Sequence, residues 1–88
     1  MIKLLSIEKA GPSFYIWIEC EGEYIRYWAK KNGFEERERH LLSDYRDYIH
    51  FVGVMGKFAP YTAFLKDPVE IEELSYWAVK KAYESISK

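Results

Sequence analysis

The chain has 88 residues, of which 49% are hydrophobic, 18% aromatic and 31% charged, and its formal net charge is −1. This length fits one domain, and the aromatic side chains are numerous enough to anchor a small core. Neither sign of charge dominates any third of the chain. The composition therefore disfavours a protein that binds a nucleic-acid duplex by neutralising many phosphates.

The residue composition also indicates the cellular compartment and the temperature to which the protein is adapted. Cys20 is the single cysteine, so no disulfide forms within the chain. Gln is absent, while Asn32 and Thr62 are the only residues of their kinds, a low-amide composition typical of thermophiles. No apolar run is long enough for a signal peptide or a membrane span. We therefore expect a cytoplasmic protein without a membrane partner.

The first part of the chain predicts three strands, at about residues 2–9, 14–21 and 23–31. Residues 10–13 read as a turn, and Glu21-Gly22 reads as a two-residue hairpin loop, since Gly suits the positive φ that such loops require. With this loop, Cys20 lies opposite Glu23. A three-residue loop would mix apolar and polar positions on each face, so we reject it.

This register gives the second and third strands two distinct faces. The inner face is apolar: Phe14, Ile16, Ile18, Cys20, Ile25, Tyr27 and Ala29. The outer face is aromatic and charged: Tyr15, Trp17, Glu19, Tyr24, Arg26, Trp28 and Lys30.

Residues 34–55 are predicted to form a long helix after Asn32-Gly33 ends the sheet. Its apolar positions recur at helical spacing: Phe34, Leu41, Tyr45, Tyr48, Ile49, Val52 and Met55. The charged run of residues 33–40 would then be a solvated helix start. The alternative is a break near Asp44, with the β-forming residues 48–54 as a fourth strand.

A second helix is predicted from Asp67 to the C-terminal region. Asp67 is a good N-cap, Pro68 suits the first helical position, and Glu70 follows three residues after the cap. The apolar stripe of this helix would be Ile71, Leu74, Ala78, Ala82 and Ile86. Trp77 projects away from that stripe among charged residues.

The predicted fold is therefore α+β: a three-stranded antiparallel sheet followed by two helices packed on one face, in the order βββαα. Two helices on the inner face would leave the outer face uncovered.

That outer face carries the main functional hypothesis. Because Tyr, Trp and Arg are enriched at interface hot spots, we expect a non-enzymatic interaction module, acting as a homodimer or with another protein. Trp17 would face Arg26 across the strands, and Tyr15 would pack edge-to-face on Trp28. The predicted contact residues are Tyr15, Trp17, Tyr24, Arg26, Trp28 and Lys30.

Two other readings of this face remain open. The aromatic rings and the stems of Arg and Lys side chains could simply shield the sheet. Alternatively, the rings could stack on the bases of single-stranded RNA or DNA, with Arg26, Lys30 and Lys31 on the backbone. Glu19, Glu21 and Glu23 at the hairpin end would repel phosphates, so they and the charge balance of the chain disfavour nucleic acid.

No catalytic or cofactor motif is recognisable in the sequence. On the predicted long helix, His40, Asp44 and Asp47 would share one flank, a spacing that allows a divalent metal ion. An ordinary solvated face is the simpler interpretation. Cys20 has acidic neighbours and points toward the core in the proposed register, so a structural cysteine is favoured over a nucleophile.

Overall fold

The structure, a computed structural model, describes residues 1–87 and contains a five-stranded antiparallel sheet with two α-helices. The spatial order of the strands is β4-β3-β2-β1-β5. In chain order the elements are β1 (Ile2–Ala10), β2 (Ser13–Cys20), β3 (Glu23–Lys30), β4 (Gly33–Leu41), a short 3-10 turn (Leu42–Asp44), α1 (Tyr48–Phe58), β5 (Phe64–Ile71) and α2 (Tyr76–Ile86). The prediction of a three-stranded sheet was therefore wrong, although the α+β class is correct.

The predicted hairpin between β2 and β3 is confirmed, including its register. Cys20 lies opposite Glu23, and the pairing continues without interruption to Phe14 opposite Ala29. The loop residues Glu21 and Gly22 have φ values of 49° and 80°. Both values are positive, as a tight two-residue hairpin loop requires.

Residues 34–41, predicted to begin a helix, instead form the edge strand β4. The chain turns at Lys31-Asn32 so that Gly33 pairs with Lys30, and β4 then runs antiparallel to β3. Glu and Arg favour helices when only local propensity counts. Here the tight turn brings residues 33–41 beside the free edge of β3. Hydrogen bonding to that edge favours a strand over a helix. A cross-strand ion pair adds to it, since Arg39 bonds Glu23 on β3 and also Glu36 on its own strand.

The helix α1 begins only at Tyr48. Its N-cap is Asp47, whose carboxylate accepts a 2.7 Å hydrogen bond from the backbone N–H of His50. In the alternative reading, a helix breaks near Asp44 and residues 48–54 form a strand. The chain does change element there, after the 3-10 turn (Leu42–Asp44), but a strand precedes this point and a helix follows it, the reverse of that prediction.

The predicted helix start at Asp67-Pro68 was also wrong, because these residues belong to β5. On one side of them Leu4 pairs with Val69 and on the other Ser6 pairs with Phe64, so residues 65–68 form an irregular stretch of an edge strand. Proline is tolerated there since no ladder hydrogen bond needs its missing N–H. The helix α2 begins after Ser75, whose hydroxyl accepts a 3.1 Å hydrogen bond from the N–H of Ala78.

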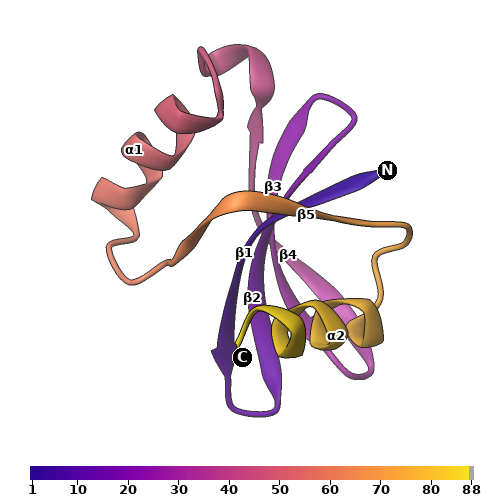
Figure 1. The fold of residues 1–88 in the computed structure, drawn as a ribbon. Helices are drawn as coiled ribbons and strands as arrows, with labels where there is room; N and C mark the ends of the chain where they lie inside the picture. Colours follow the sequence, from indigo (N-terminus) through magenta and orange to yellow (C-terminus); the bar gives the residue numbers. More distant parts are fainter. Residues whose placement is uncertain (88) are drawn as a thin grey trace.

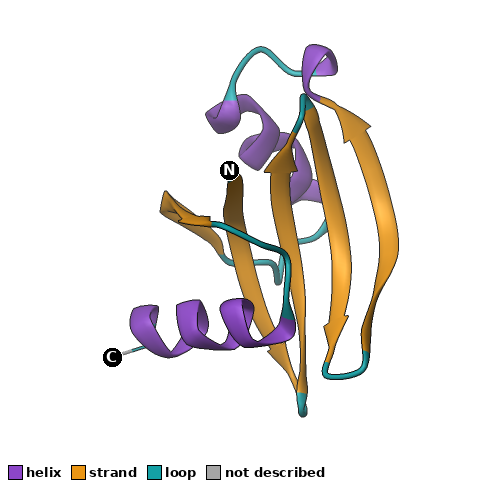
Figure 2. Ribbon diagram, turned by 90° about the vertical axis from the view of Figure 1, so that its right-hand side faces the viewer, coloured by secondary structure: helices purple, strands orange, loops and turns teal. Residues whose placement is uncertain are grey.

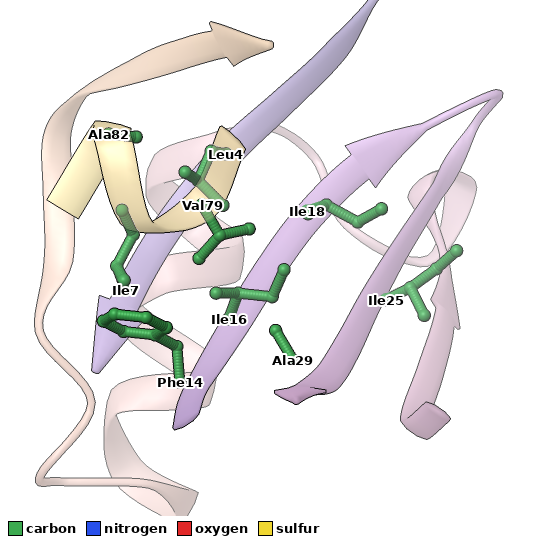
Figure 3. Close-up of a cluster of buried hydrophobic side chains, with 9 residues drawn as sticks. All are labelled: Leu4, Ile7, Phe14, Ile16, Ile18, Ile25, Ala29, Val79 and Ala82. Carbon is green, nitrogen blue, oxygen red and sulfur yellow. The ribbon is translucent and has the colours of Figure 1, made fainter. Parts of the chain in front are cut away.

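The two helices pack on opposite faces of the sheet, not on the same face as predicted. Figure 1 shows α1 and α2 on either side of the strands, and Figure 2 shows them toward opposite ends of the sheet. On the inner face, α2 completes a cluster shown in Figure 3: Leu4, Ile7, Phe14, Ile16, Ile18, Ile25, Ala29, Val79 and Ala82.

A second cluster lies between α1 and the outer face. Its buried members are Leu5, Trp17, Tyr24, Phe51 and Met55. The ring of Phe51 stacks on Tyr24 at 3.9 Å between centroids and meets Trp17 edge-on at 5.2 Å. Bulky side chains thus occupy both faces of the β2–β3 hairpin in part because a hydrophobic cluster lies on each side of the sheet.

Candidate interaction surface

Helix α1 divides the six predicted contact residues into a covered group and an open group. Trp17 is 2% exposed and Tyr24 is 1% exposed, so both are core residues beneath α1. The other four are partly exposed: Tyr15, Arg26, Trp28 and Lys30. We call these four residues the open half-face.

Two aromatic rings and two cations form the open half-face. The rings of Tyr15 and Trp28 stack with their centroids 6.0 Å apart and an interplanar angle of 21°. The guanidinium carbon of Arg26 lies 5.0 Å from the Tyr15 ring centroid, and Lys30 Nζ lies 4.7 Å from that of Trp28. Such contacts hold the cations in place while leaving their donors available.

This geometry corrects two details of the prediction. Tyr15 and Trp28 are stacked and not edge-to-face, and Arg26 lies over Tyr15 and not over Trp17. The reason is α1: the ring of Trp17 packs against Phe51 and Phe64 instead. Arg26 is left on the uncovered part of the sheet.

Acidic side chains border the open half-face on both sides. Glu8 pairs with Tyr15 from β1, and Glu35 pairs with Trp28 from β4. Lys30 Nζ lies 3.7 Å from a carboxylate oxygen of Glu35. The surface therefore presents both signs of charge around an aromatic centre.

A hollow of about 340 Å³ adjoins the open half-face where α1 ends. Arg26 and Glu8 form one wall, and the end of α1 with the loop that follows it forms the other: Phe58, Ala59, Pro60, Tyr61 and Thr62. Phe58 is 79% exposed and Tyr61 is 90% exposed. These two large rings extend the accessible aromatic surface beyond the sheet.

Phe58 and Tyr61 were not predicted from the sequence. Phe58 follows Phe51 by seven residues and Met55 by three, a spacing that predicts a buried position on the sheet-facing side of α1. Phe58 is nevertheless exposed, because it is the last residue of α1.

Ionisation on the outer face is governed by burial and by β4 ion pairs. Burial raises the pKa of Tyr24 to about 12, and the negative charges of Glu19 and Asp47 add to the effect. Burial also raises the pKa of Tyr48. On β4, the hydrogen bond from Arg39 lowers the pKa of the Glu36 carboxyl.

The metal hypothesis loses its geometric basis. His40 lies in β4, Asp44 in the 3-10 turn and Asp47 at the cap of α1, so they no longer share a helix flank. His40 instead contacts Glu38 and the hydroxyl of Tyr45. Among residues 1–87, no three His, Cys, Asp or Glu side chains converge as metal ligands would.

Cys20 is half-buried at the margin of the inner cluster, as expected for a side chain on the inner face.

Comparison of the chain with known protein families, with curated proteins and with solved structures found no match. Neither helix in the described part of the chain has the length and apolar character needed to cross a bilayer.

Proposed function

We propose that the protein is a non-enzymatic interaction module that forms a homodimer through the open half-face. The observation that supports this proposal is the stacked Tyr15–Trp28 pair with Arg26 beside it, left accessible where α1 stops covering the sheet. Trp, Tyr and Arg are the residues most often found to dominate binding energy at interfaces.

The mixed charge of this surface favours a second copy of the chain as the partner. In a two-fold symmetric dimer, the same patch meets itself, so it must be self-complementary. Arg26 and Lys30 lie beside Glu8 and Glu35. A two-fold rotation can therefore bring the basic groups of one copy to the acidic groups of the other.

The same balance makes the open half-face a poor surface for nucleic acid. Lys30 is already paired with Glu35, and Arg26 lies opposite Glu38 across the strands. Phosphates would meet carboxylates along both neighbouring strands.

The end of α1 and the loop after it supply further contact area. Phe58 and Tyr61 flank the hollow beside Arg26 and expose most of their ring surface. A partner seated on Tyr15 and Trp28 would also cover these rings, and large exposed aromatic groups on one side of a small protein are typical of interaction sites.

The test is absolute molar mass in solution by light scattering, measured over a wide range of protein concentration. We expect a dimer for the natural chain. Trp28→Glu combined with Arg26→Glu should weaken dimerisation by at least about 30-fold, as loss of hot-spot residues does. Circular dichroism checks that the variant remains folded.

Trp77→Glu is the matched control, because Trp77 is also an exposed tryptophan but lies on α2, which packs on the other face. It should leave the dimer intact. A natural chain that stays monomeric at all concentrations would refute the proposal, and so would a folded Trp28→Glu, Arg26→Glu variant that remains fully dimeric.

A further inference from the structure

A second aromatic surface, separate from the open half-face, lies where the start of α2 meets the turn between β3 and β4. Trp77 is 60% exposed there. Two ammonium groups approach its ring: Lys31 Nζ at 5.5 Å and Lys80 Nζ at 5.3 Å from the centroid. Figure 1 shows the start of α2 beside this turn.

A hollow of about 290 Å³ continues this surface along α2. Its lining includes two lysines and three aromatic rings, with one carboxylate: Lys9, Gly11, Pro12, Phe14, Tyr76, Lys80, Tyr83 and Glu84. Lys80 belongs both to the hollow and to the surroundings of Trp77. Tyr76 joins the two as well, because its ring meets Trp77 edge-on at 5.3 Å.

The aromatic part of this surface is held firmly. The Tyr76 hydroxyl donates a 2.7 Å hydrogen bond to the carbonyl oxygen of Pro12. The ring of Phe14 packs on Tyr76 at 5.8 Å and on Tyr83 at 5.2 Å. The rings of Tyr76, Phe14 and Tyr83 beside Trp77 are therefore already fixed, so ligand contacts with these rings cost little ordering entropy.

The charge of this surface differs from that of the chain as a whole. Lys9, Lys31 and Lys80 surround it, and Glu84 is the single acidic residue lining the hollow. None of the three lysines forms an ion pair within residues 1–87. The near-zero net charge of the sequence thus conceals a local basic region.

We propose that this surface, which we call the turn-end surface (Lys9, Lys31, Tyr76, Trp77 and Lys80), binds single-stranded nucleic acid. A base stacks on the exposed ring of Trp77, and the side chains of Lys31 and Lys80, which lie over that ring in the free protein, move onto the phosphates on either side of the base. Stacking on aromatic side chains within a basic groove is the usual way in which proteins bind single strands without reading sequence.

Two alternative occupants fit the turn-end surface less well. A duplex keeps its bases stacked inside the helix, so Trp77 would gain no base contact. A protein partner is disfavoured because lysine is depleted from the centres of protein interfaces, whereas here two lysines lie over the central ring with no ion pair among the described residues. In the open half-face, by contrast, Lys30 is paired with Glu35.

The experiment is a fluorescence-anisotropy titration of the full chain with labelled oligo-dT and oligo-U of about 12 nucleotides, a length within the usual site sizes of small single-strand binders. We expect binding that weakens steeply between about 50 and about 200 mM salt. Trp77→Ala should weaken it by about 10- to 100-fold, the range found for loss of one stacking ring.

The charge contribution is tested by combining Lys31→Ala with Lys80→Ala. Removing two phosphate contacts should make the slope of log affinity against log salt shallower by about 1.4. Lys81→Ala is the control, since Lys81 lies next to Lys80 in sequence but lines a different hollow, between α2 and β5. This control should bind like the natural chain.

Four results would overturn the proposal. The first three are absence of oligonucleotide binding at low salt, equal affinity for a duplex and a single strand, and weakening by Lys81→Ala equal to that by Lys31→Ala with Lys80→Ala. The fourth is loss of binding in Trp28→Ala with no loss in Trp77→Ala, since nucleic acid would then use the open half-face. The proposal does not depend on dimerisation, because the two surfaces share no residue.

Discussion

Tyr24 illustrates how a side chain predicted to face a partner became part of the core. Its ring stacks on Phe51 and meets Tyr45 edge-on at 5.8 Å between centroids. Removal from water disfavours the charged phenolate, so the pKa rises to about 12. Glu19 and Asp47 act in the same direction through their negative charges.

The raised pKa predicts a loss of stability in alkaline solution. The unfolded phenol ionises near its ordinary pKa of 10.0, whereas the folded one keeps its proton to about 12. The stabilisation is therefore complete below about pH 10 and is lost as the pH rises to about 12. Urea unfolding at neutral pH and near pH 12 should show that Tyr24→Phe reduces this loss by on the order of 2 kcal/mol.

Tyr61→Phe is the matched control, because the Tyr61 ring is 90% exposed. It should lose as much stability as the natural chain. Part of the loss should persist in Tyr24→Phe, since burial also raises the pKa values of Tyr45 and Tyr48. If Tyr24→Phe behaved like the control, burial of the Tyr24 phenol would not explain the alkaline loss.

At the scale of elements, α2 begins at a different residue from the one that the local sequence predicts. Both Asp67 and Ser75 are suitable N-cap residues, and Asp67 has the stronger flanking pattern. The structure caps the helix with Ser75 and leaves Asp67 exposed on β5.

Ser75→Ala should therefore lower the free energy of unfolding by about 1 kcal/mol, the usual cost of losing a cap. Asp67→Ala should change it by less than about 0.5 kcal/mol, as for an exposed surface site. Chemical denaturation of both variants measures the difference. A larger effect of Asp67→Ala would mean that α2 begins where the sequence pattern suggested.

The same contrast explains how far the sequence could predict the fold. The register of the β2–β3 hairpin follows from a two-residue loop and alternating side chains, which are local features. The identity of β4 depends on an unpaired edge of β3, and that of β5 depends on pairing with β1. These pairings join segments far apart in the sequence or depend on the fold already formed, so a short stretch of sequence does not reveal them. The helix-forming residues of β4 and the capping pattern in β5 therefore predicted helices that do not form.

The candidate surface was predictable only in part for the same reason. The outer face was identified correctly as aromatic, and its cross-strand pairs Tyr15–Trp28 and Trp17–Arg26 are present. Which half is accessible depends on where α1 lies. Because α1 was assigned to the inner face, Trp17 and Tyr24 could not be recognised as core residues.

At the scale of the whole molecule, one sheet supports two hydrophobic clusters. The cluster beneath α2 and the cluster beneath α1 share the strands β1, β2 and β3. Loss of either cluster exposes the apolar face of the same strands, so we expect the protein to unfold as one cooperative unit.

Phe51→Ala tests this cooperativity. Phe51 is 0% exposed, and its removal should cost about 3–5 kcal/mol through lost burial and a cavity. Tryptophan fluorescence, which reports Trp17 beneath α1 together with Trp28 and Trp77, and far-ultraviolet circular dichroism should shift together in urea. Ile49→Ala, at a position 72% exposed on the same helix, should change stability by less than about 0.5 kcal/mol. Separate transitions for the two signals would show that α1 detaches on its own.

The two outermost strands, β4 and β5, affect how readily the protein aggregates at high concentration. An exposed sheet edge normally offers its free backbone groups to another chain and seeds fibrils. Here β4 lines its edge with Glu and Arg side chains, and β5 carries Pro68 in an irregular stretch. Both edges thus resist added strands. The dimer proposed here would instead join two open half-faces, and a two-fold symmetric contact of that kind closes at two copies and cannot grow into a fibril.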